Sequence, residues 1–170
     1  MKYILPVVLL SLVAFSFKTY PILVVTSPVF TDSSFIPAKY TCDGEGINPP
    51  LVIDSLPDET VSIVVIVEDP DVIVTYDHWV VFNIKPGKME DYRKTIAENS
   101  KPGQEGQNGS GDIGYKGSCP RKGIHHYHYK VYALNSMLDL NEGTTKALVE
   151  AGMRGHILAY GELIGLYKRK

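Results

Sequence analysis

Ser-Ile-Val-Val-Ile-Val, residues 62–67, is a nearly unbroken run of β-branched side chains in the first half of the sequence. Such a run is typical of a strand that is buried on both of its faces. A second apolar run, His78–Ile84, follows it and stops before Pro86-Gly87. These two segments predict a sheet at the centre of the molecule, covered on both sides.

Outside this centre, further segments also have the composition of strands. They are Ile22–Val25, Leu51–Ile53, His126–Leu134 and Ile157–Tyr167. His126–Leu134 alternates polar and apolar residues, which is typical of a half-buried strand. In the last segment, Gly161 and Gly165 indicate either a bulge or a close crossing of two backbones.

Helical patterns are scarce in this chain. Thr144–Met153 has apolar residues at helical spacing, with Thr144 or Thr145 as the cap and Gly152 and Gly155 as the end. Met89–Ile96 is a candidate for one more short helical turn. Strands separated by Pro and Gly turns, with one or two short helices, predict an all-β fold of two packed sheets.

Length and charge exclude several classes of protein. The 170 residues suit a single domain with its own core. Seventeen basic and 19 acidic residues give a formal charge of −2, so no basic surplus favours nucleic-acid binding. With 44% hydrophobic residues and so little net charge, the chain is not a disordered one.

The amino terminus has the pattern of a secretory signal. Tyr3–Phe17 carries no charge and is short for a membrane span, which needs about 20 apolar residues. We therefore expect a signal peptide at residues 1–16 and a single domain at 17–170, exported to the periplasm or secreted, with an uncleaved membrane anchor as the alternative. Loss of residues 1–16 removes Lys2 and changes the formal charge to −3. Export allows a disulfide between Cys42 and Cys119, although the sequence leaves their pairing open.

Glycine gathers in one long segment without periodicity. Seven of the 15 glycines lie between Glu98 and Gly123. A loop of this length in a small domain is either functional or disordered.

Polar side chains cluster where this loop and two others meet apolar strands. Asp69 and Asp71 follow the first buried run, His78 opens the second, and His125 precedes the Tyr-rich strand. Two imidazoles beside carboxylates and glycine-rich backbone N–H groups would bind a phosphate or a carboxylate. The alternative is that both aspartates only stabilise turns around the intervening proline.

Period-two geometry separates the histidines of the Tyr-rich strand. His125 and Tyr127 share one face, and His126 and His128 share the other. We interpret the second pair as solvent-exposed side chains. The alternative is a zinc or copper site at these two histidines. No third ligand has the required spacing, so we expect no metal.

In their order along the chain, these motifs resemble the phosphatidylethanolamine-binding protein family, and most of all its bacterial and archaeal Raf-kinase-inhibitor-like branch. The motifs are Asp69-Pro-Asp71, His78-Trp-Val-Val-Phe-Asn-Ile, Gly117-Ser-Cys-Pro120 and Gly123-Ile-His125-His-Tyr127. The resemblance runs from about Val25 to the carboxyl terminus. It implies a large antiparallel sheet packed on a smaller one, with an anion pocket at one end.

By this resemblance a specific set of residues forms the pocket. The set is Asp69, Asp71, His78, His125 and Tyr127, with the loop from Gly117 to Pro120 as the rim. We expect the two imidazoles to supply donors and positive charge, Asp69 to orient an imidazole and Asp71 to fix the turn. Two positions depart from the family pattern, because His126 stands where arginine is usual and Arg121 where a second proline is usual.

The sequence therefore predicts a non-enzymatic binding protein for a small anion or a phospholipid head group, without a cofactor. The family resemblance implies a protein partner such as a protease or a kinase, and export favours the protease. The alternative is a hydrolase that uses His78, His125 and the aspartates on a phosphoester. No nucleophile motif accompanies them. A homodimer would be ordinary for such a protein.

Overall fold

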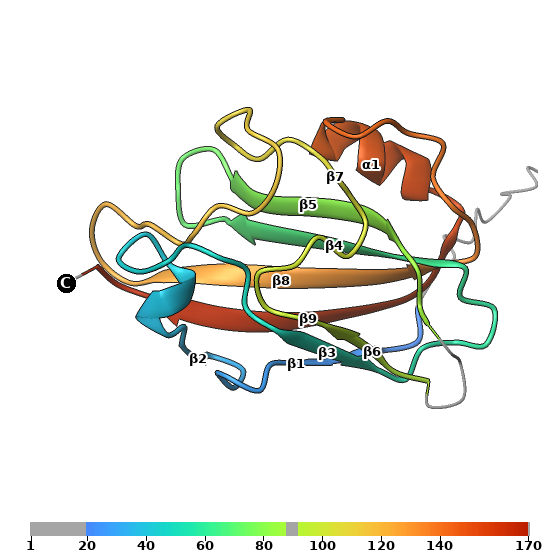
Figure 1. Cartoon of the computed structure of the whole chain (residues 1–170), viewed down its shortest axis with the longest axis horizontal. Helices are drawn as coiled ribbons and strands as arrows, with labels where there is room; N and C mark the ends of the chain where they lie inside the picture. The colour runs from blue at the N-terminus through green and yellow to red at the C-terminus, as the bar shows by residue number, and fades with distance from the viewer. Residues whose placement is uncertain (1–19, 88–91, 170) are drawn as a thin grey trace, which may run out of the picture.

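The computed structural model describes residues 20–87 and 92–169, which form two packed β-sheets (Figure 1). The large sheet contains, in spatial order, β2 (Ser34–Phe35), β9 (Ile157–Tyr167), β8 (His125–Leu134), β4 (Ser62–Asp69), β5 (Tyr76–Ile84) and β7 (Gln104–Glu105). The small sheet contains β1 (Val24–Thr26), β3 (Leu51–Asp54) and β6 (Lys94–Ile96). All paired strands are antiparallel except β2 and β9. The predicted fold class is confirmed.

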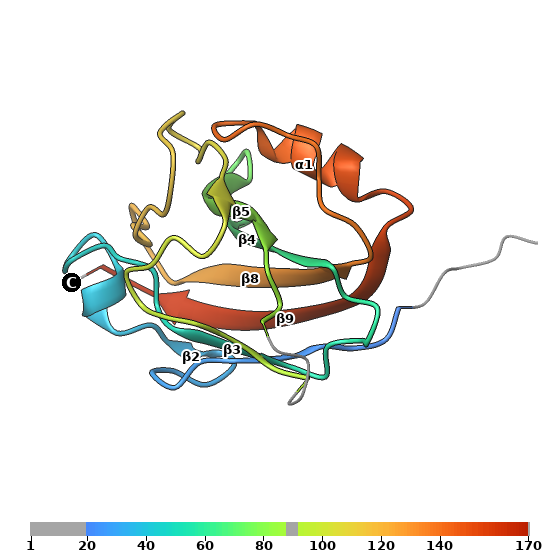
Figure 2. The same ribbon diagram turned by 45° about the vertical axis from the view of Figure 1, so that its right-hand side comes forward.

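The centre of the large sheet is buried on both faces, as the sequence predicted. Every residue of β4 is buried. Ile63, Val65 and Val67 belong to the core between the two sheets. Val64 and Ile66 belong to a second apolar cluster on the opposite face. Figure 2 shows the resulting layers, with the small sheet on one side of the large sheet and a helix on the other.

This helix, α1 (Lys146–Met153), covers the second apolar cluster. Val149 and Met153 are its buried residues. Thr145 occupies the N-cap position without a side-chain hydrogen bond, and Gly152 lies inside the helix rather than at its end. Gly155, with a φ of +82°, follows in the left-handed conformation that suits glycine at a helix end. None of the helices in 20–87 and 92–169 is long and apolar enough to cross a bilayer.

The second helical turn predicted at Met89–Ile96 is wrong where the structure describes it. Lys94–Ile96 forms strand β6 instead, and Ile96 pairs with Leu51 of β3. Pairing with the small sheet overrides the local pattern, because it buries Ile96 almost completely. Residues 88–91 lie outside the described residues, as does the predicted signal peptide at 1–16.

Gly161 and Gly165 in β9 mark a close crossing, one of the two readings the sequence allowed. A Cβ atom on Gly161 would lie 2.4 Å from the backbone oxygen of Leu23, and one on Gly165 would lie 2.5 Å from the Ile36 side chain. The pairing of β8 with β9 runs without a register shift past both positions. The glycines therefore let neighbouring chain segments approach β9.

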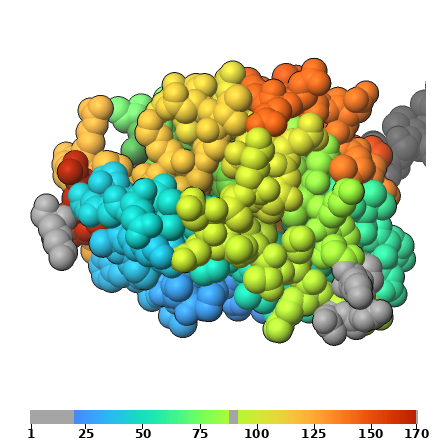
Figure 3. Space-filling model, in the orientation of Figure 1, coloured from blue at the N-terminus to red at the C-terminus, as the bar shows by residue number. Residues whose placement is uncertain are grey.

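The glycine-rich segment between Glu98 and Gly123 is packed against the sheets. It contributes β7 to the edge of the large sheet, and Ser118 forms a bridge with Thr41. Thr41 follows the short 3₁₀ helix η1 (Ala38–Tyr40). In Figure 3 this segment, yellow to light orange, covers much of the visible face. Its path brings residues 116–125 to the end of the large sheet where β4 and β9 finish.

Candidate functional site

A hollow of about 720 Å³ lies at this end of the large sheet. The loop that joins β4 to β5 and the loop that precedes β8 both lie at this end (Figure 1). Six of the seven predicted site residues line the hollow: Asp69, Asp71, His78, Gly117, Pro120 and His125. The structure therefore brings together residues that come from two distant parts of the sequence, 69–78 and 117–125.

Asp69 and His125 form an ion-pair contact in the wall of this hollow. His125 Nδ1 lies 2.7 Å from Asp69 Oδ2, and both side chains are largely buried. A carboxylate accepts only, so Nδ1 carries the proton and donates it to Asp69. The orientation of the ring is thereby fixed, and Nε2 has no hydrogen-bond partner among the described residues.

His78 is held from the other side by the backbone of Lys116. Its Nδ1 donates to the carbonyl oxygen of Lys116 at 2.7 Å, while the Lys116 N–H donates to the carbonyl oxygen of His78 at 2.8 Å. Burial lowers the pKa of His78, and this effect outweighs the hydrogen bond to Lys116 and the charge of Asp69, which raise it. At neutral pH His78 is therefore uncharged, which corrects the expectation that both imidazoles supply positive charge.

Tyr127, the seventh predicted residue, lies beneath the hollow rather than in its wall. Its ring centroid is 5.1 Å from that of His78 and 6.5 Å from that of His125. The hydroxyl is buried and has no well-formed hydrogen bond within the described part of the chain. Burial, together with the charge of Asp69, raises the pKa of Tyr127, so the hydroxyl keeps its proton. It is a donor held between two imidazoles.

Asp69 orients an imidazole, as predicted, but it also fixes the turn that was assigned to Asp71. Asp69 Oδ1 accepts the backbone N–H of Asp71 at 2.9 Å, so Asp69 fixes the turn as well as the imidazole of His125. Asp71 Oδ2 instead accepts both the backbone N–H and Nδ1 of His126, each at 2.7 Å. Asp71 thus joins the β4–β5 loop to the start of β8. His126, on the outward face, contacts a residue of the pocket.

The rim from Gly117 to Pro120 is packed tightly against the segment that follows η1. Cys42 and Cys119, whose pairing the sequence left open, form a disulfide with a Cα–Cα distance of 5.4 Å. A Cβ atom on Gly117 would lie 2.8 Å from the carbonyl carbon of Thr41. This close approach of two backbones requires glycine, and the cross-link and the glycine together place the rim beside His78.

Several residues of the hollow were not predicted. They are Val72, Ile73, Val74, Tyr76, Lys116 and Lys122. Cys119 lies in the predicted rim, and Arg121, singled out as a departure from the family, also lines the hollow. Tyr76 lies two residues before His78, so strict alternation would have placed the two on one face, although the structure has a bulge in β5 between Asp77 and Trp79. Its ring centroid is 4.8 Å from that of His78. The loop residues carry no periodic signal.

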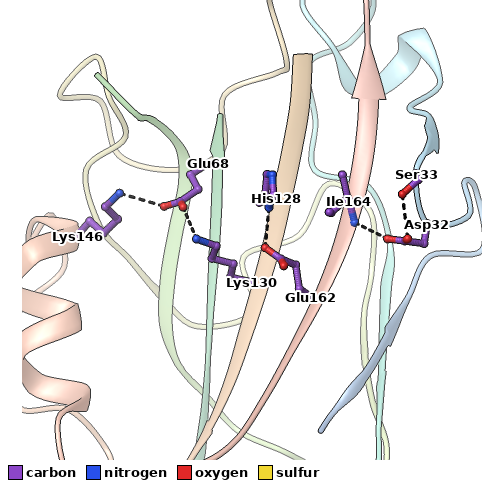
Figure 4. Close-up of polar contacts among 8 residues, drawn as sticks. All are labelled: Asp32, Ser33, Glu68, His128, Lys130, Lys146, Glu162 and Ile164. Atoms are coloured by element: carbon purple, nitrogen blue, oxygen red, sulfur yellow. Dashed lines mark hydrogen bonds and ion pairs between the residues drawn. The ribbon is translucent and has the colours of Figure 1, made fainter. Parts of the chain in front are cut away.

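The opposite face of the large sheet has charges that are paired with one another (Figure 4). Lys130 and Lys146 both reach Glu68, and His128 Nδ1 lies 2.7 Å from Glu162. Within 20–87 and 92–169, no group of three or more acidic, histidine or cysteine side chains could hold a metal ion. These contacts join β4, β8, β9 and α1.

Comparisons with known proteins agree with this architecture. The family model for phosphatidylethanolamine-binding protein matches residues 26–168. A UPF0098 protein of Pyrococcus horikoshii is 43% identical, over all of this chain and 91% of that relative. A phosphatidylethanolamine-binding protein homologue from Chlamydia trachomatis has a TM-score of 0.81 at 38% identity, over 88% of this chain and 99% of that one. YbcL of E. coli, described as a member of the mammalian family, has a TM-score of 0.78 at 26% identity, over 87% and 99%. This chain belongs to the phosphatidylethanolamine-binding protein family.

Proposed function

We propose that the protein binds a small phosphorylated anion, either free phosphate or a phosphorylated head group, without transforming it. Family membership supports a binding role. The observation that carries the proposal is a set of polar groups in or beneath the hollow that make no well-formed hydrogen bond within the described part of the chain. These are Nε2 of His78, Nε2 of His125 and the hydroxyl of Tyr127.

The charges around these groups favour an anion. Arg121, Lys122 and Lys116 line the mouth. The two carboxylates of the hollow are already engaged, Asp69 with His125 and Asp71 with His126. Cations at the mouth attract an anion, and hydrogen bonds with the interior groups then hold it.

The neutral state of His78 adds a constraint on the ligand. Because Nδ1 donates to Lys116, the free Nε2 is an acceptor at neutral pH. It can accept the proton of a singly protonated phosphate group, or it can take up a proton when a fully ionised phosphate binds. In both cases one proton is bound together with the anion, so the affinity of the protein for the anion falls as pH rises.

A hydrolase remains the alternative prediction. Both cysteines of the chain are in the disulfide, so Cys119 is no free nucleophile. An exported location is also part of the proposal, and the disulfide supports it, because such bonds persist in oxidising compartments. Modulation of a protease or a kinase by the occupied pocket stays a prediction.

Titration with inorganic phosphate and with O-phosphoethanolamine tests the proposal, with histidine ring resonances followed by NMR. We expect the resonances of His78 and His125 to shift. Those of His128, which is paired with Glu162 on the opposite face, should stay unchanged. His125→Ala should weaken binding at least about tenfold, since it removes an imidazole that Asp69 orients in the wall of the hollow. His128→Ala is the matched control.

Two results would contradict the proposal. The first is the absence of any shift at His78 and His125 at millimolar ligand. The second is turnover of a generic phosphoester that His125→Ala abolishes, which would establish the hydrolase instead.

A further inference from the structure

A second hollow, of about 340 Å³, lies on the large sheet away from the anion site. Its walls consist of three tyrosines and two isoleucines: Tyr20, Ile22, Tyr132, Ile157 and Tyr160. None of these five residues carries a charge, in contrast to the lysines and arginine of the first hollow. Small-molecule sites are concave and mostly apolar, and this volume lies at the small end of their range.

The second hollow is separated from the anion site by both distance and the thickness of the sheet. Tyr132 follows His125 in β8 by a separation of about 24 Å along the strand. Tyr127 belongs to the core between the two sheets, whereas Tyr132 packs against the apolar cluster on the opposite face. A ligand in the second hollow therefore has no contact in common with one at the anion site.

The amino-terminal segment forms one side of the second hollow. Ile22 forms a bridge with Tyr160 near the start of β9, and the Tyr160 N–H donates to the carbonyl oxygen of Pro21 at 3.1 Å. Leu23 belongs to the core between the sheets, so alternation turns Ile22 outward, where it is 80% exposed. Figure 1 shows this blue segment toward the end of the molecule opposite to the carboxyl terminus.

Two of the tyrosine rings lie side by side on paired strands. Tyr132 and Tyr160 are direct partners across β8 and β9, with ring centroids 5.0 Å apart and planes inclined at 44°. Burial, together with the charges of Glu68, Glu150 and Glu162, raises the pKa of Tyr132 to about 12. Burial and the charge of Glu162 also raise the pKa of Tyr160. Both rings are therefore neutral at physiological pH and lie close to negative charge.

The carboxylates near these rings differ in how they are paired. Glu68 is paired with one lysine of β8 and one of α1, and Glu162 contacts His128 (Figure 4). The lysine of α1 lowers the pKa of Tyr132, but it acts more weakly than each of the three carboxylates. Glu150 is exposed on α1 and makes no ion pair within the described part of the chain. Its negative charge is available to a bound cation.

We propose that the second hollow binds a small organic cation with a methylated ammonium group, of which choline is an example. The face of an aromatic ring attracts a cation, and groups of aromatic rings are a common means of recognising quaternary ammonium ions. The methyl groups of such an ion would contact Ile22 and Ile157, while Glu150 compensates its charge. The same carboxylate would repel a zwitterion that brings a carboxylate of its own, such as glycine betaine.

Titration of the full chain with choline chloride, followed by NMR, tests this proposal. We expect the side-chain methyl resonances of Ile22 and Ile157 to shift. The N-methyl protons of choline should move upfield, because they lie over tyrosine rings. The methyl resonances of Ile63, which is buried in the core between the sheets, should not move.

Two related compounds test what the second hollow recognises. The neutral isostere of choline, in which a carbon atom replaces the nitrogen, has the same shape without the charge. It should bind at least about threefold more weakly than choline, because it gains no attraction to the ring faces. Glycine betaine should also bind more weakly than choline.

Matched variants test the rings and the charge separately. Tyr160→Leu keeps an apolar side chain but removes a ring, and it should weaken choline binding at least about threefold. Tyr20→Leu is a second ring variant should the first fold poorly. Glu150→Gln should weaken choline binding about twofold, since the carboxylate is exposed. Glu45→Gln makes the same change on an exposed residue after η1, at the other end of the molecule, and should leave choline binding unchanged.

The outcomes decide the proposal in either direction. Shifts at Ile22 and Ile157 that depend on the charge of the ligand and on the tyrosine rings support it. The absence of shifts at millimolar choline would overturn it. Equal affinity for choline and its neutral isostere would overturn it as well, because the second hollow would then recognise only apolar shape. An equal loss of affinity in Glu150→Gln and Glu45→Gln would show a general charge effect and no cation site here.

Discussion

The disulfide between Cys42 and Cys119 should stabilise the folded protein by an amount that can be calculated from its span. The two cysteines are 77 residues apart in the chain. In the chain-entropy model, releasing a cross-link of that span adds about 15 cal/mol/K to the unfolded state, or about 4.5 kcal/mol at 25 °C. We expect the double variant Cys42→Ser/Cys119→Ser to lose about that much free energy of unfolding.

Phosphate affinity should respond much less to the same variant. The rim is also held by the Cys42 N–H, which donates to the carbonyl oxygen of Ser118 at 3.1 Å. Gly117 packs against the backbone at Thr41, and neither contact needs the cross-link. The affinity for inorganic phosphate should therefore stay within about twofold of wild type, since these hydrogen bonds remain.

Urea unfolding and calorimetric phosphate titration of the same samples measure the two quantities. Wild type treated with a reductant should match the double variant, which controls for the serine hydroxyls. A loss of stability below about 1 kcal/mol would refute the entropic argument. A loss of affinity above about tenfold would show that the rim depends on the cross-link rather than on backbone packing.

Three further perturbations follow from the packing and the charges. Gly117→Ala should lower phosphate affinity about tenfold in the same titration, because the added methyl group forces the rim, and with it His78, to shift. Gly152→Ala in α1 is the control and should leave phosphate affinity unchanged. Burial lowers the pKa of His78, so the unfolded chain takes up a proton before the folded chain does as pH falls below 6.5, the ordinary pKa of histidine. Unfolding free energy should therefore decrease with acid from about pH 6.5 downward, and decrease less in His78→Asn. Lys146→Ala should cost about 2 kcal/mol in urea unfolding, because it leaves Asp77 and Glu68 with less compensation, and Lys146→Arg should recover most of it.

The sequence predicted the long strands well because their patterns are local. Ser62–Val67 and His78–Ile84 were found from β-branched runs, and they form most of β4 and β5. The short strands β2, β6 and β7 were missed. Each has two or three residues and exists through its pairing with a distant strand, so no window of sequence contains the cause.

In the candidate site, too, the sequence predicted the local features and could not predict those that depend on tertiary contacts. Residue identity and alternation placed His125 and Tyr127 on one face, and the structure has their rings stacked at 6.5 Å. The contact of His126 with Asp71 could not be predicted, because it depends on the path of the β4–β5 loop. The uncharged state of His78 could not be predicted either, because its burial is a result of tertiary packing.

This last difference changes how the pocket would select a ligand. Two permanently charged imidazoles would favour any small anion, whatever its protonation. A neutral His78 beside the Asp69–His125 pair instead provides one acceptor together with the Tyr127 donor. Sulfate carries no proton at neutral pH, so it binds only when His78 takes up a proton from the solvent, whereas a singly protonated phosphate group brings its own proton to the acceptor. Selectivity for phosphate over sulfate should therefore diminish as acid protonates His78, and a pocket equally selective at every pH would contradict the assignment of its uncharged state.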